Sequence, residues 1–383
     1  MEYRKIGNLT KVVTGGTPST SVLEYWEEGN IPWLQSGCCQ NCDVEYAEKC
    51  ITQLGYDNSS TKMMPPDTVM IALTGATAGK IGYLKINACG NQSITGILPC
   101  DALDQRYLFY YLMSQREQIL TDCVGGAQAH ISQGYVKDII VPVLPLFEQK
   151  KISKKMSSID QLISLRKQQL SKLDELVKAR FVELFGDPAT NEKGWSIRDL
   201  ESVTTIVTYG LTVRPEYISE GIDLVSAREL HKGYVDYDSA PKIAENDFVK
   251  LSEKGKPQKN DILFSKTGSI GHCALVTEEK PFAITQNAAR IGLKSGTVNP
   301  LWLLYYLRMD YIQDWCKDHA KGNAVKDFQL QDIKVIPLFD CPLEVQNQFA
   351  AFVEQTDKSK FEIQQSLEKL ETLKKALMQK YFG

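Results

Sequence analysis

The chain has 383 residues, an ordinary globular composition and a formal net charge of −3. This length predicts two or three domains, each with a core of its own. The small negative charge argues against non-specific polyanion binding as the whole role, but uneven charge leaves DNA binding open. The start lacks the apolar core of a signal peptide, and no apolar run is long enough for a membrane span. The ten cysteines then predict reduced thiols in the cytoplasm.

The first globular segment, residues 1–145, predicts a mixed domain. Residues 68–73 and 81–84 are β-branched runs bounded by glycine, which is typical of strands. Residues 105–120 predict one helix, and prolines interrupt the chain just before residue 146. We expect an α+β domain with a predominantly antiparallel or mixed sheet.

A long helix is predicted for residues 146–186. No proline or glycine interrupts it before Gly186, a plausible C-terminal stop. About forty residues at 1.5 Å each give a rod of roughly 60 Å. Apolar residues recur at steps of three and four, which indicates a seam against one other helix. These residues are Ile152, Met156, Ile159, Ile163, Leu170, Leu173, Val177 and Leu184.

The rest of the chain repeats this order with a period of about 195 residues. Residues 187–341 predict a second domain with a helix at 300–315, and residues 342–383 predict a second long helix. Its seam is Phe349, Val353, Thr356, Ile363, Leu367, Leu370 and Leu377. If the two helices pack antiparallel, two similar domains are related by a pseudo-dyad and held apart by a rigid spacer. A length of roughly 60 Å corresponds to about 17 base pairs of B-DNA, which suits two short sequences separated by a fixed gap.

Several short motifs occur in the same order in both halves. The turn from Gly75 to Gly82 has a counterpart from Gly268 to Gly271, and a Pro-rich junction precedes each long helix. Other motifs are Ser158-Ile-Asp160, the segment FVELFGDP ending at Pro188, and the C-terminal LKKALMQKYF. On these motifs the whole chain resembles the specificity subunit of type I restriction-modification systems.

The resemblance implies the following architecture and role. Two homologous target recognition domains, joined by two long helices in an antiparallel coiled coil, each recognise one half of a bipartite sequence in double-stranded DNA. The helices set the spacer and dock two modification subunits, which methylate adenine N6 with S-adenosylmethionine. Restriction subunits join them and cleave with ATP and Mg²⁺. The specificity subunit itself has no catalytic residue, cofactor or metal.

Side chains suited to DNA contact lie in matching loops of the two domains. Arg228 is the sharpest candidate, because a bidentate contact from arginine to guanine is the commonest specific contact. Sequences of these loops differ between the domains, so we expect an asymmetric target. The candidates are Gln35, Ser36, Thr74, Lys80, Gln92, Ser93, Gln128, His130, Ser226, Arg228, Lys266, Ser269, Gln286, Asn287, Lys321, Asn323 and Lys326.

Other interpretations compete with DNA recognition. The segment from Leu73 to Ile81 resembles a phosphate-binding loop, but its glycine spacing is one residue short and Ile81 replaces Ser or Thr. It remains open whether this is a DNA-contacting turn or a plain β-turn. The cysteines at 38, 39, 42 and 50 lack the second close pair typical of a zinc site. The lysines of residues 150–180 fit a solvated helix face at least as well as a DNA contact. The duplicated domains could also bind protein, making the chain a scaffold.

Overall fold

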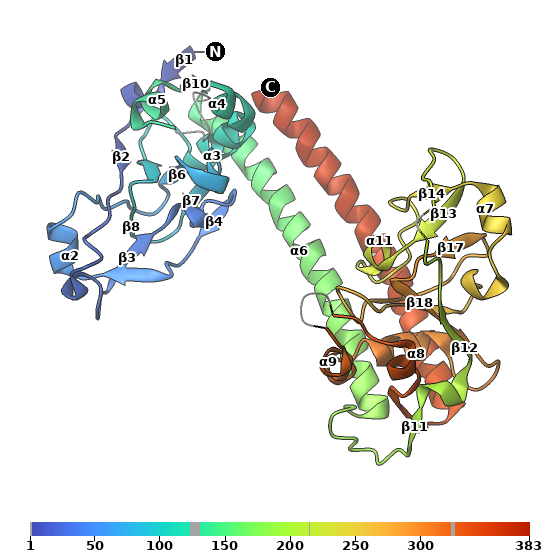
Figure 1. Cartoon of the computed structure of the whole chain (residues 1–383). Coiled ribbons are helices and arrows are strands. Elements are labelled where there is room, and N and C mark those ends of the chain that lie inside the picture. Colours follow the sequence, from blue (N-terminus) through green and yellow to red (C-terminus); the bar gives the residue numbers. More distant parts are fainter. Residues whose placement is uncertain (1, 123–130, 214, 323–325) are drawn as a thin grey trace. The chain divides into compact units, whose positions relative to one another are not determined.

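The computed structural model describes residues 2–122, 131–213, 215–322 and 326–383 (Figure 1). The chain divides into two compact units, each described here by itself. The N-terminal unit comprises Met1–Gln168 and Gln364–Gly383, and the C-terminal unit comprises Gln169–Ile363. Each unit therefore contains one half of each long helix. Within the described residues, no helix combines the length and apolarity that a membrane span requires.

The N-terminal unit contains a five-stranded sheet in the order β2-β9-β6-β7-β4. Its central strand, β6, has four buried apolar residues, as expected for a strand covered on both faces. All neighbours pair antiparallel except β4 and β7. The strands are β2 (Val12–Thr14), β4 (Cys42–Val44), β6 (Val69–Ala72), β7 (Ile81–Leu84) and β9 (Ile94–Ile97).

Two smaller sheets complete this unit. One has the order β5-β3-β8, with β3 and β8 parallel, and the other is an antiparallel ribbon of β1 and β10. Their strands are β1 (Glu2–Lys5), β3 (Ile31–Leu34), β5 (Lys49–Ile51), β8 (Cys89–Gly90) and β10 (Ile140–Val143). The short helices are α1 (Ile6–Leu9), α2 (Gln53–Asp57), α3 (Gln105–Ser114), α4 (Arg116–Asp122) and α5 (Gln133–Asp138).

The C-terminal unit repeats this topology almost strand for strand. Its sheets have the orders β12-β18-β15-β16, β14-β13-β17 and β11-β19, and β13 pairs parallel with β17 as β3 does with β8. Only β4 lacks a counterpart among these described strands. The strands are β11 (Ile197–Asp199), β12 (Thr204–Tyr209), β13 (Ile222–Val225), β14 (Lys242–Ile243), β15 (Ile262–Ser265), β16 (Cys273–Leu275), β17 (Phe282–Ile284), β18 (Ala288–Leu293) and β19 (Pro337–Phe339). The helices are α7 (Glu245–Val249), α8 (Pro300–Leu307), α9 (Asp310–His319) and α10 (Leu330–Lys334).

The prediction of a single helix in each domain is wrong, because the structure has two shorter helices in its place. In the first domain the break falls between α3 and α4. There Gln115 departs from helical backbone (φ −85°, ψ 2°), and the Ser114 hydroxyl shares the Tyr111 carbonyl with the Gln115 amide. In the second domain Met309 takes extended backbone (φ −64°, ψ 140°) between α8 and α9.

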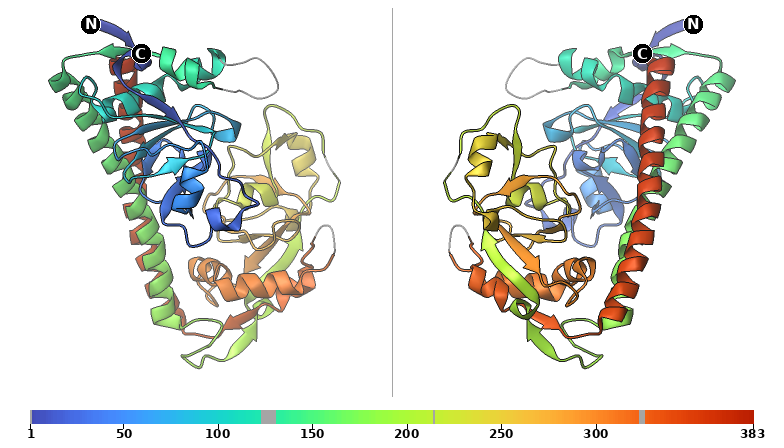
Figure 2. Two further views of the ribbon diagram at one scale, coloured as in Figure 1. Left: turned by 90° about the vertical axis from the view of Figure 1, so that its left-hand side faces the viewer. Right: turned by 90° about the vertical axis from the view of Figure 1, so that its right-hand side faces the viewer.

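The long helices are α6 (Leu146–Phe185) and α11 (Leu343–Phe382). In the N-terminal unit the start of α6 lies beside the end of α11 (Figure 2), and Asp160 pairs with Lys374 at 2.6 Å. In the C-terminal unit Asp174 pairs with Lys360 at 2.6 Å. The residue nearer the start of α6, Asp160, pairs with the residue nearer the end of α11, Lys374. The two helices are therefore antiparallel in both units. Every residue of the two predicted seams is buried or half-buried, which confirms the antiparallel coiled coil.

Each unit has one main core shared by sheet, helix and coiled coil. In the N-terminal unit Met156 and Phe382 of the long helices pack with Val69, Ile97 and Tyr107. In the C-terminal unit the core joins α8 to both long helices, with the Phe181 and Phe349 rings 5.3 Å apart. The predicted fold class, two homologous mixed α/β domains with two long helices, is confirmed.

Candidate nucleic-acid interface

Three loops of the N-terminal unit are joined edge to edge by backbone hydrogen bonds. The Asn91 amide donates to the Leu34 carbonyl at 2.9 Å, which ties the turn after β8 to the end of β3. The Leu73 amide donates to the Ser93 carbonyl at 2.8 Å, and the Leu73 carbonyl accepts from Ile131 at 3.0 Å. We call residues 35–40, 73–80 and 91–93 the N-terminal loop cluster. It gathers the predicted candidates Gln35, Ser36, Thr74, Lys80, Gln92 and Ser93.

The C-terminal unit has the same three bonds. The Thr285 amide donates to the Val225 carbonyl at 3.0 Å, and the Lys266 amide donates to the Asn287 carbonyl at 3.0 Å. The Lys266 carbonyl accepts from Phe328 at 2.7 Å. We call residues 226–231, 266–271, 285–287, 321 and 326 the C-terminal loop cluster. It gathers Ser226, Arg228, Lys266, Ser269, Gln286, Asn287, Lys321 and Lys326.

Exposed amides and one lysine mark the N-terminal loop cluster. The side chains of Gln35 and Gln92 are exposed, while Ser36 is half-buried at the start of a single 3₁₀ turn. The Thr74 hydroxyl donates to the Ser93 hydroxyl at 3.0 Å, and Lys80 Nζ donates to Gln40 Oε1 at 2.7 Å. Because the Gln40 amide is uncharged, this contact leaves the positive charge of Lys80 uncompensated.

A glycine turn closes one side of each cluster. Gly75 has a φ of 76° and Gly268 a φ of 80°, which is backbone that residues with a Cβ rarely adopt. A Cβ at either position would meet nothing within 4 Å, so conformation rather than crowding explains the glycine. The backbone of this turn is therefore accessible to a ligand.

The C-terminal loop cluster is more strongly charged. Arg228 is exposed in the 3₁₀ turn η5 (Ala227–Leu230), and Ser269, Gln286, Asn287, Lys321 and Lys326 are exposed as well. The Ser226 hydroxyl caps this turn, because it donates to Glu229 Oε2 at 2.6 Å and accepts from the Arg228 amide at 3.3 Å. Ser226 therefore positions Arg228 instead of offering a free hydroxyl.

Burial and pairing argue against Lys266 as a DNA contact. Its side chain is only 11% exposed, and Nζ pairs with Asp327 Oδ1 at 2.6 Å. An ammonium that is buried and already paired has little to offer a DNA phosphate. Three further candidates, Gln128, His130 and Asn323, lie outside the described residues.

Comparison with known proteins decides the family. Residues 1–175 and 193–375 both match the type I restriction modification DNA specificity domain. The chain belongs to the type I restriction-modification specificity family. It is a DNA target-recognition subunit with two specificity domains, and such subunits are the non-catalytic recognition component.

Two relatives are similar to this specificity subunit along most of its length. The MjaIX specificity subunit of Methanocaldococcus jannaschii is 24% identical over an alignment of 406 residues. The alignment covers 99% of this chain and 92% of that protein. The EcoBI specificity subunit of Escherichia coli is 23% identical over 314 residues, 74% of this chain and 66% of that protein.

Two solved structures share the fold. The S subunit from M. genitalium aligns with a TM-score of 0.63 at 17% identity, covering 100% of this chain and 96% of its own. A chain from a study of complex assembly in a type I system aligns with a TM-score of 0.59 at 14% identity, covering 100% and 97%.

The cysteines of the specificity subunit do not resemble a zinc site. Cys39 is fully buried. Its hydrogen bond with Cys38, together with this burial, raises the pKa of its thiol. Among the described residues no group of three or more His, Cys, Asp or Glu is placed to hold a metal ion.

Two buried glutamines of the specificity subunit were missed in the sequence. Gln149 Oε1 accepts from the Asp104 amide, the N-cap of α3, at 2.8 Å, and its Nε2 donates to the Ala102 and Leu144 carbonyls. Gln346 makes the equivalent bond to the Asn299 amide, the N-cap of α8, at 2.8 Å. Both side chains are 0% exposed. The repeated Gln after each Pro-Leu junction was the available signal, and these residues tie each domain to its long helix.

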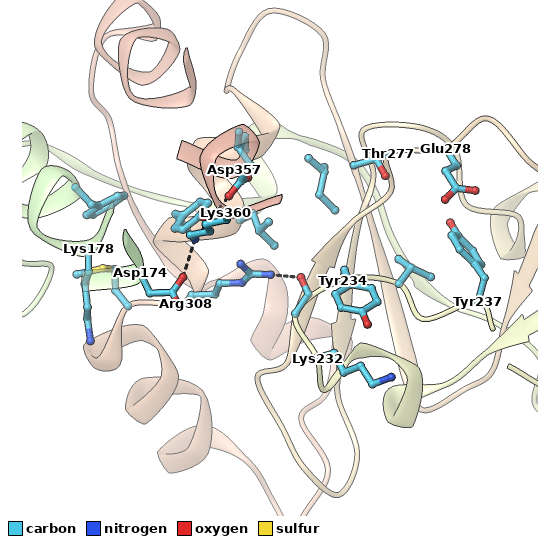
Figure 3. Close-up of a pocket in the computed structure, with 18 residues that line it drawn as sticks. Asp174, Lys178, Lys232, Tyr234, Tyr237, Thr277, Glu278, Arg308, Asp357 and Lys360 are labelled. Atoms are coloured by element: carbon cyan, nitrogen blue, oxygen red, sulfur yellow. Dashed lines mark hydrogen bonds and ion pairs between the residues drawn. The ribbon is translucent and has the colours of Figure 1, made fainter. Parts of the chain in front are cut away.

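A cavity of about 690 Å³ in the C-terminal unit is not part of the interface (Figure 3). None of the predicted DNA-contacting residues lines it. Its Lys360 pairs with Asp174, and its Arg308 donates to the carbonyls of Gly233 and Cys273. These cations join the loops and helices of the unit and are engaged within the protein.

Proposed function

We propose that each domain recognises one half of an asymmetric, bipartite sequence in double-stranded DNA. The domains are residues 1–145 and 187–341, and the two loop clusters carry the contacts. The observation that supports this most is the repeated backbone skeleton, which holds different side chains at equivalent positions. Duplicated loops with exposed amides in both copies and an exposed arginine in only one suit two different half-sites.

We infer that the helices, residues 146–186 and 342–383, set the gap between the half-sites and dock two modification subunits. Each helix runs forty residues without interruption and is shared by both units. Outside the seam, Phe147 is 68% exposed and Phe361 64% exposed. Large apolar side chains at such exposure favour a partner surface.

The family role also implies a larger complex that contains modification and restriction subunits. The modification subunits carry the adenine-N6 methylation with S-adenosylmethionine, and restriction subunits bring ATP- and Mg²⁺-dependent cleavage. The chain itself supplies no catalytic group or cofactor. It acts in the cytoplasm, where the DNA and the partner subunits are found.

The test is to assemble the chain with its modification subunits and map methylated adenines on genomic DNA by long-read sequencing. We expect methylation confined to one split, non-palindromic sequence, and retardation of a duplex carrying it over a scrambled duplex. An assembled complex without sequence selectivity would favour a protein-binding scaffold instead.

The spacer is tested by shortening both helices. Lys167 pairs with Glu371 at 3.5 Å, so four residues around each can be removed together. The deletion shortens each helix by about 6 Å, or about two base pairs of DNA. We expect the methylated sequence to keep both half-sites and lose part of its gap; an unchanged gap contradicts the spacer role.

A further inference from the structure

An apolar cavity adjoins the N-terminal loop cluster. It has a volume of about 660 Å³ and lies next to two of the predicted DNA-contacting residues, Gln35 and Gln92. Leu23, in the 3₁₀ turn η1 (Leu23–Tyr25), also lines it, and its side chain is 63% exposed and so accessible to a ligand. Trp26 and Trp33 complete its apolar part.

The tryptophans present carbon to this cavity because their N–H groups are engaged. Trp26 Nε1 donates to the Ser19 carbonyl at 3.1 Å, and Trp33 Nε1 donates to the Gly16 carbonyl at 3.0 Å. The rings pack edge to face with centroids 4.9 Å apart, and Trp33 is only 4% exposed. Trp33 therefore offers no open face on which a whole base could stack.

The polar rim of the cavity carries two glutamine amides, beside Thr17, Thr20, Lys49 and Asn91. Gln35 is exposed, and Gln92 is held by the Thr17 hydroxyl, which donates to its Oε1 at 2.5 Å. A glutamine pairs bidentately with adenine N6 and N7, whereas guanine is preferentially contacted by arginine or lysine. Among the described lining residues the one cation is Lys49, and none is an arginine.

Base pairs in the major groove differ in a way that matches this arrangement. An A·T pair presents the adenine edge that glutamine recognises beside the C5-methyl group of thymine, which apolar side chains contact. We propose that this cavity is the subsite for an A·T pair, with Leu23 contacting the thymine methyl and Gln35 or Gln92 the adenine edge. The proposal rests on the function proposed above and assigns a base type to one half-site.

The experiment uses the complex of the chain with its modification subunits and the mapped target duplex. Each thymine in both half-sites is replaced in turn by deoxyuridine, which lacks only the methyl group, and Kd is measured by competition. We expect about three- to fivefold weaker binding at one or more thymines of a single half-site, as for loss of one buried methyl. In Leu23→Ala this ratio falls to about one, because uracil and thymine duplexes then bind alike.

Matched variants make the result decisive. Leu23→Met keeps an apolar contact and should retain the thymine preference, while thymine-to-uracil ratios in the other half-site should not change in any variant. Because Leu23 is exposed, the Ala variant should fold, which assembly with the modification subunits checks. Equal binding of uracil and thymine duplexes at every position, or a ratio unaffected by Leu23→Ala, overturns the proposal while sequence selectivity persists. Loss of all selectivity in the wild-type complex would instead refute the proposed function.

Discussion

The two loop clusters share a backbone and differ in chemistry. Equivalent hydrogen bonds place Leu34 in the same position as Val225, and Leu73 in the same position as Lys266. On this common frame the N-terminal cluster carries exposed amides beside an apolar cavity, and the C-terminal cluster carries an exposed arginine. Main-chain bonds do not depend on side-chain identity, so the loops are free to change what they contact without changing the fold.

The lysines of the two clusters sharpen this contrast. Lys80 donates to an uncharged amide, Gln40 Oε1, whereas Lys266 is paired with Asp327 and is nearly buried. The same residue type therefore serves different purposes beside two similar turns. A positive charge near a glycine turn predicts a phosphate contact only when nothing in the protein neutralises it.

The largest expected effect concerns what the two units share. Gln149→Ala and Gln346→Ala should each lower the free energy of unfolding by about 2–4 kcal/mol, because buried backbone partners lose their hydrogen bonds. Urea denaturation measures this, with exposed Gln161→Ala as the control, expected within about 0.5 kcal/mol of wild type. If only one of the two buried variants is destabilised, the units are not equivalent at this junction.

The next effect distinguishes the clusters. Arg228→Ala should relax base discrimination by about 1–3 kcal/mol at one position of one half-site, because a bidentate contact with guanine is lost. Binding of the assembled complex to targets mutated at each base pair measures it. Equal weakening on every sequence would assign Arg228 to a phosphate.

The sequence predicted the scaffold better than the contacts. The seam from Ile152 to Leu184 was predictable because helical periodicity alone selects the buried face. Repetition in the sequence likewise predicted matching domains. Neither signal depends on which distant residues meet in space.

The sequence does not reveal roles that depend on tertiary partners. Lys266 looks like an exposed loop lysine until Asp327, 61 positions along the chain, is placed beside it. Gln149 is a polar residue near the start of a predicted helix, and only the position of the Asp104 N-cap explains its burial. Leu23 and Trp26 carry no motif, so their cavity beside Gln35 is visible only in three dimensions.

The contrast between the lysines makes a third prediction. Lys80→Ala should weaken DNA binding about equally on all sequences and reduce the slope of log Kd against log salt by about 1, as for one lost phosphate contact. Lys266→Ala should leave that slope unchanged. Titrations of the complex with target and scrambled duplexes from low to physiological salt test both. A reduced slope in Lys266→Ala would return this residue to the DNA contacts.

The smallest effect is the acid response of the Lys266–Asp327 pair. Burial opposes the charge on Asp327, yet hydrogen bonds from Lys266 and Thr267 hold its pKa below the ordinary value. A carboxyl whose pKa is lower in the folded state stabilises that state above its unfolded pKa of about 3.9. The stabilisation is lost as pH falls through the folded pKa, so this pair should weaken only below about pH 4.

Asp327→Asn should therefore be less stable than wild type at neutral pH, and the difference should shrink as the solution is acidified. Denaturation midpoints between pH 7 and pH 3 measure this, with exposed Asp318→Asn as a control that should track wild type throughout. The lysine partner in the N-terminal cluster is an uncharged amide, Gln40, so Gln40→Ala should show no such dependence on pH. A pH-independent deficit in Asp327→Asn would mean that the aspartate acts through its shape and hydrogen bonds and not through its charge on Lys266.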